Sequence, residues 1–106
     1  MSDSEKELLN DWLIKLYASL KEKNEEIEVL ENKMGYREKL NELYLDRLNT
    51  WLTHKGLDSD VKEELEFSKK AIERMLGEFK DRLSHLKKSK KATMFMIDNI
   101  EKELRD

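Results

Sequence analysis

The chain has 106 residues, of which 42% are charged and 38% hydrophobic, and it carries a net charge of -3. It has no cysteine, which excludes a disulfide framework, a thiolate metal site and a cysteine nucleophile. The mild net charge argues against nucleic-acid binding by the molecule as a whole. With no proline and only three glycines, almost nothing interrupts helix, so we expect a single all-α domain spanning residues 1–106.

The first predicted helical arm covers residues 4–55. Ser4 followed by Glu7 resembles a capping box at its start. Apolar residues then recur at alternating steps of four and three, which predicts a coiled-coil seam. Its members are Leu9, Leu13, Leu16, Leu20, Lys23, Ile27, Leu30 and Met34, of which Lys23 is the one polar member. Trp12 and Tyr17 widen the stripe, and a wide stripe needs more than one helix to cover it.

The phase of this stripe slips at Gly35, where we expect a kink. Beyond it a new stripe consists of Leu40, Leu43, Tyr44, Leu48, Trp51 and Leu52.

The clearest stop signal lies at the middle of the chain. Gly56 suits the left-handed residue after a helix, with Leu52 and Leu57 placed for the hydrophobic contact of a Schellman ending. Asp58, Ser59 and Asp60 are three candidate N-caps for the next helix. We therefore predict a turn at residues 56–59 and an antiparallel helical hairpin.

The second predicted arm covers residues 60–105. Up to Gly77 its heptad stripe is Val61, Leu65, Ser68, Ile72, Met75 and Phe79. After Gly77 the pattern is better followed as Leu76, Phe79, Leu83, Leu86, Thr93, Ile97, Ile100 and Leu104. The shift predicts a second kink near Gly77.

Folding the arms about Gly56 places Gly35 opposite Gly77 and the lysine-rich segment 87–91 opposite the acidic segment 22–26. Two continuous arms give a coiled-coil hairpin with kinks near both glycines. If the glycines break the arms, the same chain gives a three- or four-helix bundle. The wide stripes meet at the open end of the hairpin, where we expect them to drive homodimerisation into a four-helix bundle.

Aromatic and methionine residues near the open end are the first candidate binding surface, because such side chains make adaptable helix-binding sites. Residues of this kind are equally suited to a sealed core, and we weigh the two interpretations alike. The predicted partner-binding residues are Leu9, Trp12, Leu16, Met94, Phe95, Ile97 and Ile100.

A basic run is the second candidate site. Lys87, Lys88, Lys90 and Lys91 could contact a polyanion. Pairing with the acidic segment opposite is the favoured interpretation, and no aromatic residues interleave the lysines as in a single-strand binder. Nucleic acid is therefore not the expected partner.

Catalytic and metal chemistry have little support. Asp81 and His85 lie one helical turn apart, but no further histidine or cysteine is within reach, so an exposed pair is favoured over a metal site. No phosphate loop or catalytic triad is present. We predict a non-enzyme without cofactor or metal.

Two stretches resemble the small helical flagellar export chaperones. The first is the acidic-apolar run 26–30 leading to Arg37-Glu38-Lys39-Leu40. The second runs from Ile72 through Phe79 and Leu83 into the basic stretch 87–92, although Met94 and Phe95 stand where that family often has a tyrosine. The resemblance implies a cytoplasmic chaperone that holds the helical end of a hook-associated or filament-cap subunit, with Met94, Phe95, Ile97 and Ile100 as a contact surface.

The leading hypothesis is thus a protein–protein interaction module, an adaptor or chaperone that captures an amphipathic helix of a partner. A small nucleic-acid-associated regulator using the lysine run and a structural coiled-coil spacer are the alternatives. The acidic N-terminus lacks the plan of a signal peptide and no apolar run could span a membrane, so a cytoplasmic location is expected.

Overall fold

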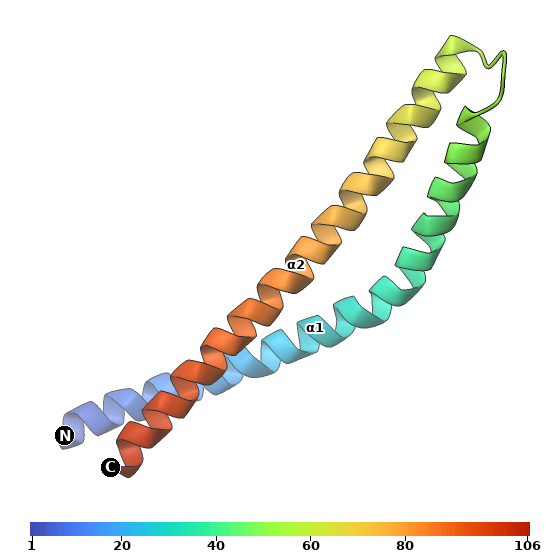
Figure 1. Cartoon of the computed structure of the whole chain (residues 1–106). Coiled ribbons are helices and arrows are strands. Elements are labelled where there is room, and N and C mark those ends of the chain that lie inside the picture. The colour runs from blue at the N-terminus through green and yellow to red at the C-terminus, as the bar shows by residue number, and fades with distance from the viewer. The chain divides into compact units, whose positions relative to one another are not determined.

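The computed structural model describes all residues from Met1 to Asp106. Two helices make up almost the whole chain: α1 spans Asp3–Leu52 and α2 spans Ser59–Arg105, and residues 53–58 connect them (Figure 1). This confirms the all-α helical hairpin. Both helices continue through their glycines, so a three- or four-helix chain is not supported. A helical glycine costs only about 1 kcal/mol relative to alanine, which neighbouring apolar contacts readily offset.

The helix starts differ from the predicted caps by a few residues. Ser2, not Ser4, caps α1, because its Oγ accepts a hydrogen bond from the Glu5 amide at 3.2 Å. Ser2 and Glu5 have the same spacing that drew attention to Ser4 and Glu7. Of the three candidates at the second helix, Asp58 is the cap: its Oδ1 accepts from the Asp60 amide at 2.8 Å.

The connection is longer than the predicted turn at residues 56–59. Gly56 has φ of 76°, as the left-handed prediction required. However, α1 already ends at Leu52, and its last turn is tightened by backbone bonds from Thr53 to the Thr50 carbonyl and from His54 to the Trp51 carbonyl, both 3.2 Å. The arms predicted at 4–55 and 60–105 are therefore helices of 50 and 47 residues.

The chain divides into two compact units, each made of one segment of either helix. The terminal unit comprises residues 1–30 and 83–106, and the turn unit comprises residues 31–82. In the terminal unit, Leu16, Ile97 and Ile100 form a buried cluster. The partly buried residues packed against it are Leu9, Leu13, Leu20, Met96 and Leu104.

The register within each unit lies about one helical turn from the prediction. In the terminal unit Tyr17 contacts Glu101 and Lys23 contacts Thr93. The lysine run is therefore offset by about one turn from residues 22–26, and only its end near Lys91 lies level with Glu25 and Glu26. In the turn unit Glu38 pairs with Lys80, so Gly35 does not face Gly77. The connection explains the offset of the register in the turn unit. The start of α2 extends beyond the level at which α1 ends, and residues 53–58 span this difference (Figure 1).

The buried side of α2 shows no phase shift at Gly77, which corrects that prediction. Side chains shielded from solvent recur at steps of four and three along the whole helix. Ser68 and Met75, expected in the seam, are exposed. The seam of α2 instead consists of Leu65, Lys69, Ile72, Leu76, Phe79, Leu83, Leu86, Lys90, Thr93, Ile97, Ile100 and Leu104.

On α1 the predicted slip near Gly35 is confirmed. Two consecutive steps of four, from Leu30 to Met34 and from Met34 to Glu38, replace the usual alternation. An inserted step of this kind is a stutter, which moves the shielded stripe around the helix. The seam then continues through Asn41, Leu45, Leu48 and Leu52.

Candidate interaction surface of the turn unit

The turn unit has a partly polar seam and an apolar side. Its seam includes Glu38, Asn41 and Lys69, and Leu48 is its only buried residue. Only part of each apolar stripe predicted from the sequence lies beside that seam, because the seam itself contains Leu48, Leu52, Leu65, Ile72 and Phe79. Leu43, Tyr44 and Trp51 of α1 leave almost half of their surface exposed, as do Val61 and Met75 of α2. We call this set of five residues the apolar side of the turn unit.

These residues of both helices lie on the same side of the hairpin. Arg37 sits over the ring of Phe79 at 5.5 Å from its centroid, and this contact links the two helices on that side. Tyr44 and Trp51 follow Arg37 at steps of seven residues, and Met75 precedes Phe79 by four, so helical periodicity keeps them together. Lys80 follows Phe79 and points about 100° away from it around α2, so the Glu38–Lys80 ion pair, at 3.8 Å, lies on the opposite side.

Grooves run along the apolar side. The larger has a volume of about 520 Å³ and is lined by Leu43, Tyr44, Arg47, Leu48 and Trp51 of α1 with Ile72 of α2. A second, of about 320 Å³, is lined by Trp51, His54, Leu57, Val61 and Leu65 next to the connection. Trp51 lines both, so the apolar surface extends from the connection to the middle of the turn unit. An apolar groove between two helices is the form of site that accepts an amphipathic helix.

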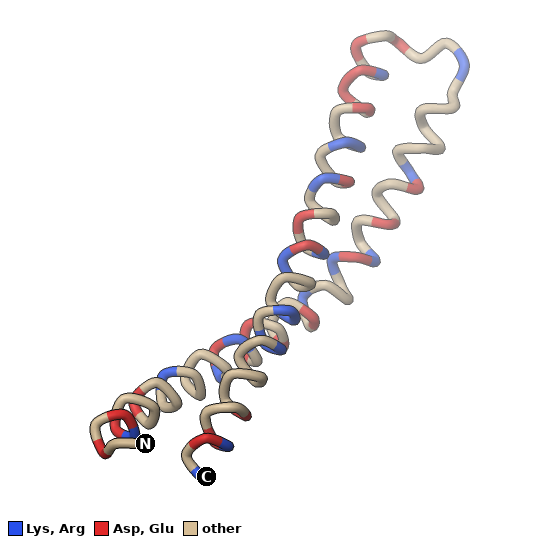
Figure 2. The backbone as a smooth tube through the Cα atoms, turned by 60° about the vertical axis from the view of Figure 1, so that its left-hand side comes forward, with Lys and Arg blue, Asp and Glu red and all other residues tan.

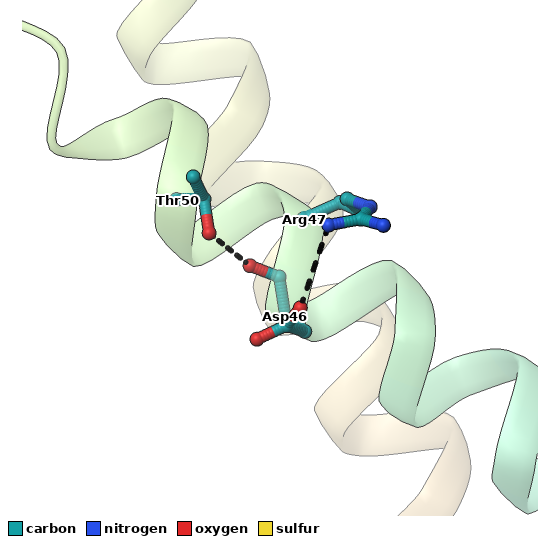
Figure 3. Close-up of polar contacts among 3 residues, drawn as sticks. All are labelled: Asp46, Arg47 and Thr50. Carbon is teal, nitrogen blue, oxygen red and sulfur yellow. Dashed lines mark hydrogen bonds and ion pairs between the residues drawn. The ribbon is translucent and has the colours of Figure 1, made fainter.

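Arg47 places a charge at the edge of the larger groove. Its guanidinium pairs with the adjacent Asp46 carboxylate at 3.8 Å, and the Thr50 hydroxyl donates to the Asp46 carbonyl oxygen at 2.9 Å (Figure 3). Both members of the ion pair are more than half exposed, so the pair contributes little stability. The guanidinium is therefore available to an acidic group of an incoming helix.

The residues predicted to bind a partner at the open end do not form one surface. Leu16, Ile97 and Ile100 are the buried cluster of the terminal unit, and Leu9 packs against them. Trp12, Met94 and Phe95 are exposed. Because Met94 and Phe95 are consecutive, they point about 100° apart around α2. Of the seven residues, only these three are accessible to a partner without opening the core.

A buried polar layer interrupts the apolar core of the terminal unit. Thr93 is the most buried side chain of the chain, with 1% of its surface exposed. Its hydroxyl accepts from the Lys23 ammonium at 2.8 Å and donates to the Ser89 carbonyl oxygen at 3.0 Å. One polar layer at a seam position fixes register and partner choice at some expense in stability.

The lysine run does not form a single basic surface. Lys90 lies half-buried at the seam, whereas Lys88 and Lys91 are exposed. Lys87 is exposed and already takes part in a polar interaction. Successive helical residues point in different directions, so at most a part of the run faces one ligand.

Tyr17 is the group with a perturbed ionisation. Its hydroxyl donates to the Glu101 carboxylate. This hydrogen bond, followed by desolvation and by the charges of Glu101 and Asp98, raises the pKa of Tyr17 above its ordinary value of 10.0. The contact shows that Tyr17 of α1 and Glu101 of α2 lie at nearly the same level in the terminal unit.

The structure meets neither the requirements of a metal site nor those of a membrane-spanning helix. No group of three or more histidine, aspartate or glutamate side chains is arranged to hold a metal ion, and Asp81 and His85 are exposed. Neither helix contains a stretch apolar enough and long enough to cross a bilayer.

The chain matches no protein-family model, and neither the curated proteins nor the solved structures contain a similar one. The resemblance to flagellar export chaperones therefore stays a prediction, and the apolar side of the turn unit has to be interpreted from its own chemistry.

All five residues of the apolar side belong to apolar stripes predicted from the sequence, but the role predicted for them is different. The stripes around Tyr44, Trp51 and Met75 were predicted as the hairpin's own seam. Arg47 and Leu57, which line the grooves, were missed as site residues. The available signal was the presence of two overlapping heptad phases in each helix, of which only one can face the neighbouring helix.

Proposed function

We propose that the chain is a non-enzymatic protein-interaction module, an adaptor or chaperone, that binds an amphipathic helix along the apolar side of its turn unit. The observation that carries the proposal is the groove lined by Leu43, Tyr44, Trp51 and Ile72. Half-exposed aromatic residues of this kind are typical anchors of protein interfaces. Leucines spaced at i, i+3, i+4 and i+7 on a partner helix would fill the groove.

The edge of the groove suggests the chemistry of the partner. Arg37 and Arg47 border the apolar side on α1. A helix with acidic residues flanking its apolar stripe would complement them, and such flanking charges set partner choice in coiled coils. A cytoplasmic export chaperone would be one module of this kind, as the flagellar resemblance implies.

Two-dimensional NMR tests the proposal, because the two tryptophans lie in different units. The indole N–H signal of Trp12 reports on the terminal unit and that of Trp51 on the turn unit. The probe is a synthetic helical peptide with leucines at i, i+3, i+4 and i+7 flanked by glutamates, and a scrambled peptide is the control. We expect saturable shifts of Trp51, Leu43 and Tyr44. Shifts confined to Trp12, Met94 and Phe95 would place binding at the open end, and no shift in either unit would refute a helix-binding module.

Nucleic-acid regulation stays the alternative from a different class. Replacing Lys87, Lys88, Lys90 and Lys91 by glutamine would abolish polyanion binding by such a regulator and leave peptide binding unchanged. The half-buried position of Lys90 favours a structural role for at least that lysine.

A further inference from the structure

We propose that the apolar side of the turn unit binds a second copy of this chain, with the two connections at the same end and α1 of each copy packed against α2 of the other. This inference rests on the proposed function, since it names an occupant for the same surface.

The first support is the area that the turn unit leaves uncovered. Leu43, Tyr44, Trp51, Val61 and Met75 each expose 45–49% of their surface. For a large side chain that fraction is on the order of 100 Å², so these five alone expose about 400–500 Å². Monomeric proteins rarely expose larger continuous apolar patches. With the flanking residues, the surface approaches the roughly 800 Å² per partner of a stable interface.

The second support is a match in size between the two edges of this side. On α1 the edge is formed by Arg37, Tyr44 and Trp51, which follow one another at seven-residue steps. On α2 the corresponding edge is formed by Glu64, Ala71 and Glu78, also at seven-residue steps. Ala71 and the nearby Ser68 are small and exposed, whereas Tyr44 and Trp51 are bulky. Bulky residues opposite small ones allow two helices to interdigitate.

The third support is charge. The α1 edge carries Arg37, and Arg47 lies beside that edge. The α2 edge carries Glu64 and Glu78, and Arg82 lies beside that edge near the end of the unit. The start of α2 is visibly acidic (Figure 2). Packing α1 on α2 of the other copy therefore brings opposite charges together, whereas packing α1 on α1 brings like charges together.

The register observed within the turn unit aligns these edges. The contacts Arg37–Phe79 and Glu38–Lys80 fix which residues of α1 and α2 lie at one level. At that register Glu78 is nearly level with Arg37, and Ala71 with Tyr44. A rotation about an axis parallel to the helices keeps each level unchanged, so the copies would form Arg37–Glu78 and Tyr44–Ala71 contacts twice. The product is a four-helix bundle in which all neighbouring helices are antiparallel.

Sedimentation equilibrium of the full chain tests the proposal. We expect a dimer that Ala71→Arg weakens at least a hundredfold, because the new charge would be buried against Tyr44 of the other copy. Ala71 is exposed in the single chain, so this change leaves the hairpin intact. Ala18→Arg is the matched control, an identical change at an exposed alanine of the terminal unit, and we expect it to leave dimerisation unchanged. Equal behaviour of the two variants would overturn the proposal.

Charge reversal tests the arrangement. Arg37→Glu and Glu78→Arg should each weaken the dimer about tenfold, and the double variant should restore it, as for a charge pair at an interface. A nitroxide attached at Lys55→Cys should report a separation between copies of about 20–30 Å, since helices in a bundle lie 8–10 Å apart. A much longer separation would place the connections at opposite ends and overturn the arrangement.

The outcome separates this inference from the proposed function. A wild-type chain that is monomeric at 100 μM but whose Trp51 indole responds to the leucine–glutamate peptide would overturn self-binding alone. A monomer whose Trp51 signal responds to no peptide would overturn both.

Discussion

The terminal unit and the turn unit differ in how much apolar side chain they bury between similar helices. The terminal unit buries Leu16, Ile27, Leu86, Ile97 and Ile100, whereas the turn unit buries Leu48 alone. The terminal unit directs its best apolar residues between its two helices, where Leu16, Ile97 and Ile100 are buried. The turn unit places Glu38, Asn41 and Lys69 among the apolar residues between its helices. It leaves Tyr44 and Trp51 half-exposed. Heptad strength alone therefore does not identify which neighbour a stripe faces. A stripe becomes a seam or a surface according to its phase relative to the neighbouring helix.

Removing a core side chain should show the contrast most strongly. We expect Ile97→Ala to destabilise the terminal unit by about 2–5 kcal/mol, because it deletes buried apolar contacts. Phe95→Ala, a larger truncation on the same helix, should change stability by less than about 0.5 kcal/mol, since Phe95 is 69% exposed. Urea unfolding followed by circular dichroism measures both. Similar losses would show that the terminal unit does not have the core described.

The polar layer of the terminal unit should respond to substitution by a smaller amount than its apolar core. Thr93→Val removes the acceptor of the Lys23 ammonium while keeping the side-chain shape. A half-buried charge without its partner should cost about 1–3 kcal/mol. Replacing Lys23 by leucine in the same chain should recover that loss or more, because an apolar pair fills the layer. Additive losses in the double variant would contradict coupling between the two residues.

Replacing a glycine by alanine should change the stability by a smaller amount, and in opposite directions in the connection and in the helices. Gly56 has positive φ, and Gly56→Ala should cost about 1–2 kcal/mol. Gly77 lies within α2, and Gly77→Ala should gain up to about 1 kcal/mol. Neither added methyl group would meet another atom within 4 Å, so backbone conformation alone decides the sign. Thermal unfolding of the two variants should therefore shift in opposite directions.

The smallest expected effect is at Tyr17. Its pKa is raised by the hydrogen bond to Glu101, so the folded state favours the neutral phenol. The stabilisation is therefore fully present below the unfolded pKa of about 10 and lost as pH rises through the higher folded value. A difference ultraviolet titration of the wild type against Tyr17→Phe should show a phenol ionising above pH 10. Ionisation at or below that pH would contradict the contact.

Much of the fold could be predicted from the sequence because local signals decide it. The absence of proline predicts the long helices, and Gly56 with Asp58 predicts the reversal. The observed caps differ from the predicted ones because Ser2 and Ser4, or Asp58 and Asp60, offer nearly equal local hydrogen bonds. The observed register differs from the predicted one because it depends on how far α2 extends beyond the end of α1, and no local sequence signal encodes that length.

The candidate surface could be predicted only in part. Tyr44, Trp51 and Met75 were recognised as apolar stripe residues, but their stripe was assigned to the intramolecular seam. Val61, Leu65, Ser68, Ile72, Met75 and Phe79 form the more regular apolar pattern, and only the structure shows that Ser68 and Met75 lie outside the seam. Lys69 and Leu76 are shielded in their place.

Hydrogen exchange over a series of protein concentrations tests the contrast between the units most directly. Amides of the terminal unit should be protected to the same degree at every concentration, because its core lies within one chain. Protection in the turn unit should rise with concentration, because a second copy covers Tyr44 and Trp51. Equal and concentration-independent protection in both units would show that the turn unit is complete by itself and would contradict the difference described between them.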